Sequence, residues 1–306
     1  MKASVLVLAS IFFAPVALAQ PMVTSSPAEK IKILSWNIYM LPGFLGHGKI
    51  PRAEAIGQLL SSSDYDVLVF QEAFHQKARK KIRRLLQSAF PFQVGPANRK
   101  LISLKTNSGL WIFSRHPIED FHSIVFKTRS GIDAMSRKGA VLVELKIGGN
   151  PIQIIGTHLQ NSGEEWFRQG QCVELYHLLL KKYGRPGVPQ LICGDFNINR
   201  HGYGDDYLLM LQTLDASDGE MGAENLYTYD RAKNDLQVEP GTERDLIDYI
   251  LVRPNEASIS CTERRVRTFQ QRWDSLHKDL SDHYSIEAEL YFNIQFSNLL
   301  TVSAPK

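Results

Sequence analysis

The sequence predicts an α/β protein built from two packed β-sheets with helices on the outside. Short runs rich in Val, Ile and aromatic residues recur along the chain, and each is bounded by Gly, Pro, Asn or Asp, as strands are. Helix-like stretches and hairpin-like connections lie between these runs, which favours paired sheets covered by helices. The chain has 306 residues, 43% of them hydrophobic, and no internal repeat or low-complexity linker, so one large domain over residues 31–293 is expected.

The expected strands share the composition of buried β-structure. They cover residues 31–36, 66–70, 109–114, 140–147, 152–157, 190–193, 247–252 and 284–292. The expected helices cover residues 52–62, 76–89, 164–183 and 205–214. Within 164–183, helical spacing predicts a core-facing stripe of Trp166, Cys172 or Val173, Tyr176, Leu179 and Leu180.

Residues 1–19 have the pattern of a secretory signal peptide. One Lys precedes an apolar run that ends in Ala17-Leu18-Ala19, a small-residue cleavage site, and the run is short for a transmembrane span. Residues 20–30 form a polar lead-in, and residues 294–306 form a C-terminal tail. We therefore expect a secreted protein, extracellular or periplasmic, without a transmembrane segment.

Charge and cysteine content exclude several classes of site. The formal net charge of +3 is too small to indicate nucleic-acid binding, and no nucleic-acid partner is expected. Cys172, Cys193 and Cys261 are odd in number, so at least one thiol is unpaired within the chain, and no bridge is assigned from the sequence. Their spacing offers no CxxC motif and no zinc cluster.

Two basic stretches stand out. KARKKIRR at 77–84 fits a helix with Ile82 and Leu85–Leu86 turned inward, so its cations form either a solvated face or a dock for anionic surfaces. RRVRTFQQRW at 264–273 mixes cations with Phe269 and Trp273 in a long connection, where a functional loop is plausible.

Polar side chains gather where the expected strands end or begin. These residues are Asn37, Glu72, His158, Asp195, Asn197, Asn199, Asp248, Asp282 and His283. Each alone has an ordinary explanation, such as a turn cap, an Asx-turn, a surface charge or a hydrogen-bonded core histidine. Asp248 is harder to explain, because a carboxylate in the apolar run 247–252 needs a partner, and His283 is a candidate.

Taken together, these residues predict a metal-dependent phosphoester hydrolase. Glu72, Asn37, Asp195, Asn197 and Asp282 offer hard oxygen ligands, which suit Mg²⁺ better than zinc, with other divalent cations as alternatives. His283, oriented by Asp248, would activate water, and His158 would stabilise or protonate the opposite side. No covalent enzyme intermediate is required.

The ordered motifs resemble the endonuclease/exonuclease/phosphatase superfamily. The matching segments are Asn37, QE at 71–72, GTH at 156–158, GDFN at 194–197, DY at 248–249 and SDH at 281–283, which span most of residues 33–290. The resemblance implies a four-layer α/β sandwich of the deoxyribonuclease I type, two packed mixed β-sheets flanked by helices. It also implies a Mg²⁺ site at one edge of the paired sheets, in a single catalytic domain.

Other segments resemble the secreted bacterial sphingomyelinases C. They are NIYMLP at 37–42, GIDAMSRKGAVLVELK at 131–146, GTHLQ and LQTLDAS at 211–217. The resemblance implies hydrolysis of sphingomyelin to ceramide and phosphocholine by a monomer at a sphingomyelin-containing membrane surface. It places Glu72 and Asn37 at the main metal, with Asp195, Asn197 and His283 at a second metal or water position. Asp282 would belong to the metal shell or support it, and His158 would act opposite His283. Asp133 and Lys138 would form a catalytic or switch element.

The chain departs from that branch in two places. The bacterial enzymes carry a hairpin with exposed aromatic residues before SDH, whereas here the region is Arg-rich with only Phe269 and Trp273. They also have a short disulfide loop after GTHLQ, where this chain continues with NSGEEW. Membrane binding would then depend more on cations or be weak.

Three alternatives remain open at this point. A secreted nuclease on the same scaffold would use the same metal residues but should carry broad basic grooves. A phospholipase C acting on other choline phospholipids would share the headgroup. A non-catalytic binding protein would have lost catalytic residues, yet every motif position is filled.

Overall fold

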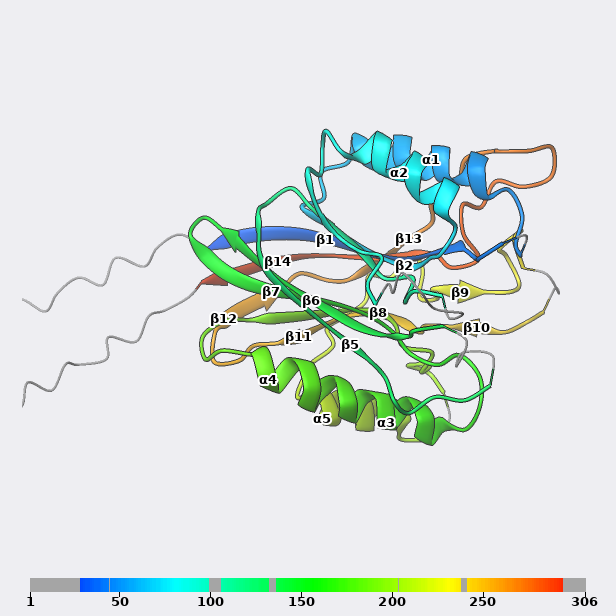
Figure 1. Cartoon of the computed structure of the whole chain (residues 1–306). Helices are drawn as coiled ribbons and strands as arrows, with labels where there is room; N and C mark the ends of the chain where they lie inside the picture. Colours follow the sequence, from blue (N-terminus) through cyan, green and yellow to red (C-terminus); the bar gives the residue numbers. More distant parts are fainter. Residues whose placement is uncertain are drawn as a thin grey trace, which may run out of the picture.

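The chain forms four layers, helix–sheet–sheet–helix, in the computed structural model (Figure 1). The structure describes residues 28–43, 45–98, 106–131, 136–202, 204–237 and 241–293. The predicted signal peptide, nearly all of the lead-in, the C-terminal tail and Asp133 lie outside the described residues. The predicted fold class, two packed mixed sheets flanked by helices, is confirmed.

The first sheet has the strand order β12-β14-β1-β2-β4-β3, with β13 also paired to β14. Only β1 and β2 run parallel among its neighbours, so the sheet is mixed. Its strands are β1 (Glu29–Met40), β2 (Val67–Ala73), β3 (Phe92–Val94), β4 (Trp111–Ser114), β12 (Ser258–Cys261), β13 (Arg265–Arg267) and β14 (Ser285–Asn293).

The second sheet has the order β11-β8-β7-β6-β5, in which β7 and β8 are parallel. Its strands are β5 (Ile118–Val125), β6 (Gly139–Ile147), β7 (Asn150–His158), β8 (Gln190–Asp195) and β11 (Asp248–Arg253). A separate small ladder joins β9 (Tyr229–Asp230) to β10 (Arg244–Asp245).

Helices cover the outer face of each sheet (Figure 1). α1 (Lys49–Ser61) and α2 (Gln76–Leu86) pack on the first sheet. α3 (Glu165–Leu175), the π-helical turn 176–180, α4 (Lys181–Tyr183) and α5 (Asp206–Leu214) lie on the second sheet. None of the helices in the described part of the chain is both long enough and apolar enough to span a bilayer.

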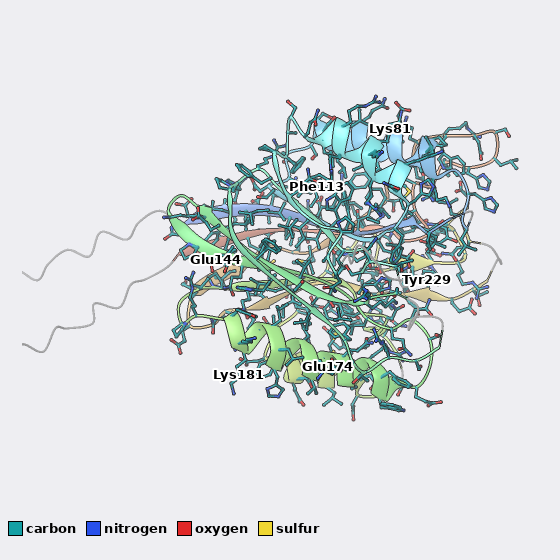
Figure 2. The ribbon with its side chains drawn as sticks, viewed as in Figure 1. Lys81, Phe113, Glu144, Glu174, Lys181 and Tyr229 are labelled. Carbon is teal, nitrogen blue, oxygen red and sulfur yellow. The ribbon has the colours of Figure 1, made fainter. Side chains whose placement is uncertain are left out.

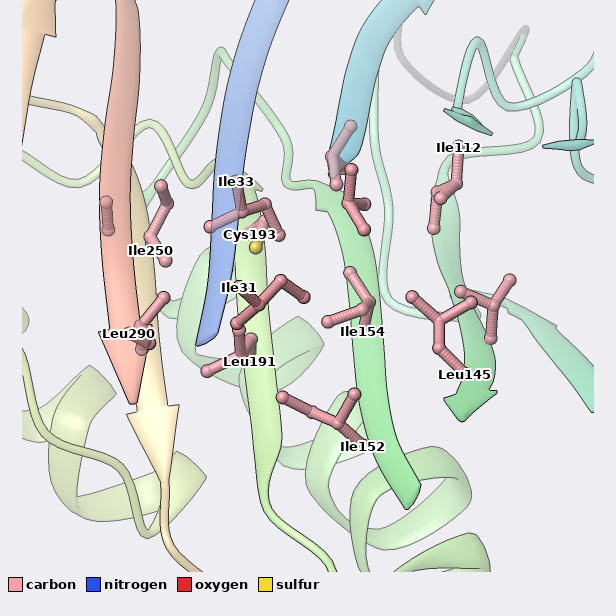
Figure 3. Close-up of a cluster of buried hydrophobic side chains, with 14 of the residues drawn as sticks. Ile31, Ile33, Ile112, Leu145, Ile152, Ile154, Leu191, Cys193, Ile250 and Leu290 are labelled. Carbon is pink, nitrogen blue, oxygen red and sulfur yellow. The ribbon is translucent and has the colours of Figure 1, made fainter. Parts of the chain in front are cut away.

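The core lies in three layers because central strands are buried on both faces. In β1, Ile31 and Ile33 point between the sheets, whereas Leu34 and Trp36 point toward the helices. Leu191 and Cys193 of β8 meet Ile154 of β7 and Ile250 of β11 in the layer between the sheets (Figure 3). This two-sided burial explains why these strands read as continuous apolar runs rather than alternating ones.

The predicted elements all form, but some short strands were not predicted. These are β3, β5, β9, β10, β12 and β13, which are short or, like β5, exposed on one face. The predicted helix 164–183 is interrupted by the π-helical turn. The prediction that Trp166 faces the core is wrong, since it is 60% exposed and stacks on Phe167.

Candidate active site

Strand register brings three predicted residues together in the second sheet. Asp195 at the end of β8 is paired with His158 of β7 on one side and Asp248 of β11 on the other. All three side chains are almost completely buried. Because β7 and β8 are parallel, their carboxyl ends meet at one edge of the sheet.

The first sheet contributes residues from the same end of the molecule. Asn37 of β1 donates from Nδ2 to Asp195 Oδ2 at 3.1 Å, which links the two sheets. Asn37 lies inside β1, three residues before its end, where the pairing with β2 shifts register. Glu72 lies near the end of β2 with a φ of 56°, an uncommon conformation for a glutamate.

These side chains surround a cavity of about 440 Å³. Figure 2 shows Tyr229, one of its lining residues, at the end of the sandwich opposite Glu144. The predicted residues that line the cavity are Asn37, Glu72, His158, Asp195, Asn197, Asn199, Asp282 and His283. Asp248 and Lys138 do not line it but contact the two histidines that do.

His283 and Asp248 form a buried pair. His283 Nδ1 lies 2.9 Å from Asp248 Oδ2, and His283 Nε2 lies 3.8 Å from Asp195 Oδ2. Burial alone would lower the pKa of His283, but the carboxylates of Asp248 and Asp195 outweigh it and raise the pKa well above its usual value. The expectation that His283 is the partner of Asp248 is confirmed.

His158 has the opposite electrostatic environment. Lys138 Nζ lies 3.1 Å from His158 Nε2 and donates to the Leu159 carbonyl at 2.8 Å. Burial and the charge of Lys138 hold the pKa of His158 well below its usual value. Lys138 can only donate, so in this arrangement His158 is neutral and Nε2 accepts.

The carboxylates of the cavity repel one another in the absence of a cation. Burial raises the pKa of Glu72, and the nearby Asp282 raises it further. Burial followed by Asp248 raises the pKa of Asp195, and burial also raises that of Asp282. Glu72 Oε2 and Asp248 Oδ1 are buried without a hydrogen-bond partner among the described residues.

This donor set fits a divalent cation. Hard oxygen ligands converge on a cavity where buried carboxylate oxygens lack partners, and a positive ion would satisfy both conditions. Ligand atoms of Asp195, Asp248 and His283 lie within 4.8 Å of one another, so they too could hold an ion. One oxygen of Asp248 already bonds His283, and Asp248 does not line the cavity, which favours the lining residues as ligands.

The backbone conformation of the loop after β8 orients Asn197. Asn197 adopts a φ of 52°, which Asn tolerates better than most residues, and its N–H donates to Asp195 Oδ1 at 3.0 Å. Its side chain donates to the Leu159 carbonyl at 3.2 Å. The loop after β8 is therefore tied both to Asp195 and to the end of β7.

A buried arginine connects two of the segments that carry site residues. Arg52 of α1 donates to the carbonyls of Ile38 at 3.2 Å, Tyr39 at 2.7 Å and Leu280 at 2.9 Å. These bonds join the end of β1 to the turn that carries Asp282. Arg52 could not be singled out from the sequence, because a basic residue at the start of a helix carries no special signal.

Other lining residues were also missed. Tyr39, Asn161, Tyr229 and Asp245 line the cavity, and the ring of Tyr229 lies 5.2 Å from that of His283. Tyr39 lies within a segment already singled out, whereas Tyr229 and Asp245 lie in short strands that the pattern does not reveal. The three cysteines are all free thiols.

The aromatic residues of 264–273 are packed rather than presented to solvent. The ring of Phe269 lies 5.3 Å from that of Trp36. Trp273 donates from its indole to the Asp279 carbonyl at 2.8 Å, and a Cβ on Gly48 would collide with its ring. Just after this stretch, the apolar side chain of Leu276 is 78% exposed.

Several known proteins are similar to this chain in sequence and in fold. The Endonuclease/Exonuclease/phosphatase family matches residues 34–283. A phospholipase C of Staphylococcus aureus is 27% identical over 84% of this chain and 86% of its own length. A sphingomyelinase C of Bacillus cereus is 25% identical over 89% of this chain and 92% of its own length.

Solved structures of related proteins have a similar fold. The crystal structure of a beta toxin from S. aureus has a TM-score of 0.77 and 27% identity, and the match covers 84% of this chain and 99% of the toxin. A mutant of beta toxin from S. aureus was solved with bound magnesium ions, with a TM-score of 0.77, 25% identity and coverage of 86% and 99%. With the family match over residues 34–283 and the cavity described above, this chain is a sphingomyelinase C-like member of the Endonuclease/Exonuclease/phosphatase family.

Proposed function

We propose that the chain hydrolyses sphingomyelin to ceramide and phosphocholine in a Mg²⁺-dependent reaction. The observation that carries the proposal is the His283–Asp248 pair at 2.9 Å, which borders the same cavity as the unpartnered Glu72 carboxylate. That combination supplies a base and a metal ligand at the same cavity. The choice of sphingomyelin is supported by the sphingomyelinase C relatives of B. cereus and Listeria ivanovii, which are 25% and 26% identical.

The metal would be held by residues of both sheets. We assign Glu72 and Asn37 to the main metal position and Asp282 to its shell or its support. Asp195, Asn197 and His283 would line a second position, for a metal or for the attacking water. When bound, Mg²⁺ supplies positive charge that stabilises the negative charge developing on the phosphoryl oxygens. The choice of Mg²⁺ is supported by the hard oxygen donors and by the magnesium-bound relative.

His283 would take a proton from water once a bound cation offsets the carboxylates that raise its pKa. Its Nδ1 is held by Asp248, so Nε2 is the nitrogen left to face the cavity. The Asp248 carboxylate fixes the ring orientation and stabilises the imidazolium that forms. Asp248 is therefore a positioning residue, and His283 is the catalytic base.

Lys138 and His158 lie against Asp195 from the other side. His158 Nε2 is 3.4 Å from Asp195 Oδ2, and the same nitrogen lies 3.1 Å from Nζ of Lys138, which is only 5% exposed. We assign His158 to contact with the phosphodiester and Lys138 to orienting His158 while adding positive potential. Asp133 remains a predicted partner of Lys138.

The setting of the reaction is proposed from the sequence and the relatives. Residues 1–19 would be removed on export, and the mature chain would act as a monomer on sphingomyelin-containing membranes from the extracellular or periplasmic side. The packed positions of Phe269 and Trp273 support membrane contact through other groups than these rings.

The test is release of phosphocholine from sphingomyelin vesicles by the mature protein, with Mg²⁺ and with EDTA. Phosphatidylcholine vesicles and plasmid DNA run in parallel, with His283→Ala as the inactive control. We expect Mg²⁺-dependent release from sphingomyelin, little from phosphatidylcholine and no nicking of DNA.

Other outcomes would redirect the assignment. Equal hydrolysis of both lipids would make the chain a broader phospholipase C, as the name of its S. aureus relative suggests. Nicked DNA without lipid hydrolysis would move it to the nucleases while leaving the metal site unchanged. No hydrolysis of any of the three would refute the proposal.

A further inference from the structure

A second cavity lies beside the catalytic one and plays no part in the proposed reaction. Its volume is about 620 Å³, larger than that of the catalytic cavity. Its lining comes from the loop 223–227, the β9–β10 ladder with the nearby Lys233, the connection 268–278, and Tyr284 directly before β14. The residues that matter for its chemistry are Tyr227, Asp230, Lys233, Arg244, Lys278 and Tyr284.

The two cavities share a single layer of backbone. Tyr229 pairs with Asp245 in the small ladder and with His283 in an isolated bridge, so these three residues form one row. Their chain neighbours point the other way, as successive residues of extended chain do. Each segment therefore contributes one residue to each cavity. The catalytic cavity is lined by Tyr229, Asp245 and His283, and the second cavity by their neighbours Asp230, Arg244 and Tyr284.

The two cavities differ in charge. Glu72, Asp195, Asp245 and Asp282 make the catalytic lining acidic. The second lining carries three cations and only two carboxylates, Asp230 and the exposed Glu224. When no metal is bound, the acidic catalytic cavity repels anions, whereas the excess of cations in the second cavity attracts them.

One carboxylate of the second cavity is already neutralised. Asp230 is 1% exposed and accepts from Arg244 Nε at 3.1 Å and from Nη2 at 3.0 Å. The Arg244 guanidinium also lies 4.2 Å from the centroid of the Tyr227 ring. Arg244 is thus held in place from two sides and presents a fixed cationic wall.

The remaining cations and one buried hydroxyl are free to bind. The side chains of Lys233 and Lys278 have no hydrogen bond or ion pair with any described residue. Tyr284 is 5% exposed, lines the cavity, and its hydroxyl likewise has no partner in the described part of the chain. Burial and the nearby Asp279 raise the pKa of Tyr284, so the hydroxyl stays protonated and can donate.

We propose that this second cavity, defined by Lys233, Arg244, Lys278 and Tyr284, binds a phosphate-bearing anion. Two mobile ammonium groups, a fixed guanidinium and a phenolic donor match the acceptor oxygens of a phosphate group. The phosphate belongs either to the headgroup of an anionic phospholipid or to a soluble phosphate. This site goes beyond the proposed function and does not depend on the lipid that is hydrolysed.

The first experiment is calorimetric titration of the full mature chain with inorganic phosphate in Mg²⁺ buffer. The test variant is Lys233→Gln/Lys278→Gln. The matched control is Lys127→Gln/Lys146→Gln, which removes two exposed cations away from the cavity. We expect the test variant to lose at least about 10-fold in affinity at one site and the control to match the wild type.

A second variant keeps the charge and removes only the hydroxyl. Tyr284→Phe should weaken phosphate binding by about 3–10-fold, since one hydrogen bond to a charged group is lost. Equal phosphate binding by the wild type and both cavity variants would refute a site for soluble phosphate. Because the titration involves no turnover, its result does not depend on whether the chain hydrolyses sphingomyelin.

Vesicle binding separates the two sources of phosphate. Flotation compares phosphatidylcholine vesicles with vesicles that also contain phosphatidic acid. If the ligand is a lipid headgroup, phosphatidic acid should increase vesicle binding by the wild type but not by Lys233→Gln/Lys278→Gln. Inorganic phosphate should then compete with the phosphatidic acid vesicles for the wild type. If the ligand is soluble, only the titration changes. If neither measurement separates this variant from its control, the proposal is wrong.

Discussion

At the residue scale, burial distinguishes two histidine–aspartate pairs of equal length. His283 and Asp248 are 2.9 Å apart with side chains 7% and 0% exposed. His277 and Asp274 are also 2.9 Å apart, but their side chains are 26% and 38% exposed. Only the buried pair is held in an environment that strengthens its charge interaction.

This contrast gives a matched test of the catalytic base. His283→Ala should lower kcat by about 10²–10⁴-fold. Asp248→Asn should lower it by about 10–100-fold, because the imidazole remains but loses its charged partner. His277→Ala should change it little. The measurement is Mg²⁺-dependent hydrolysis of a soluble phosphodiester, with circular dichroism to verify folding. More than a tenth of wild-type activity in His283→Ala would exclude His283 as the base.

Glu72 makes the dependence on metal testable without turnover. In EDTA, Glu72→Gln should raise Tm, because burial and Asp282 disfavour the charged carboxylate. Mg²⁺ at 100 times its Kd should stabilise the wild type by about 2.7 kcal/mol and the variant much less. Glu119→Gln, which removes an exposed carboxylate, should respond to Mg²⁺ as the wild type does. An unchanged Mg²⁺ response in Glu72→Gln would remove Glu72 from the metal site.

At the element scale, β8 delivers Asp195 through a close approach to β7. Gly194 has a φ of 152° and lies directly before Asp195 in the strand. A Cβ there would collide with the backbone carbonyl of Thr157. The glycine therefore allows β7 and β8 to bring His158 and Asp195 into register.

Gly194→Ala should reduce both stability and activity. Overpacking costs about 1–3 kcal/mol and the positive φ about 1–2 kcal/mol more. Gly149→Ala is the control, because Gly149 also has a positive φ but has open space around its missing Cβ. Urea unfolding should show the larger loss for Gly194→Ala, and equal losses would contradict the steric explanation.

The helix after β7 shows how tertiary packing overrides a sequence pattern. Trp166 fits the helical spacing of the apolar residues, yet Cys172, Leu175, Leu179 and Leu180 form the buried face. The π-helical turn 176–180 changes the register of that face partway along. A simple periodicity cannot include such a shift, so Trp166 was assigned to the wrong side.

At the scale of the whole molecule, the layer between the sheets sets the geometry of the site. Ile154 of β7 is completely buried there beside Leu191 of β8 (Figure 3). Ile154→Ala should cost about 2–5 kcal/mol of unfolding free energy. Leu276→Ala removes a side chain that is 78% exposed and should change stability by less than about 0.5 kcal/mol. Denaturant unfolding of both variants tests this, and similar costs would mean that the sheets are not tightly packed.

The sequence predicted the long central strands and most of the site. β1, β2, β6, β7, β8, β11 and β14 are buried, apolar and bounded by turn residues, so composition alone revealed them. The motif residues Asn37, Glu72, His158, Asp195 and His283 line one cavity as the ordered motifs implied. Short strands such as β9 and β10 were missed because two residues carry no usable period.

The sequence by itself determined the fold class, the family and the chemical types available for the site. Those properties depend on local composition and on motifs that keep their order along the chain. Only the tertiary structure decided that Asp248 and Lys138 lie behind the histidines, and that Arg52 joins β1 to the turn before β14. It also decided which side of the β9–β10 ladder faces each cavity. The physical reason is that strand register and sheet packing set these distances between residues far apart in the chain, and no local pattern encodes them.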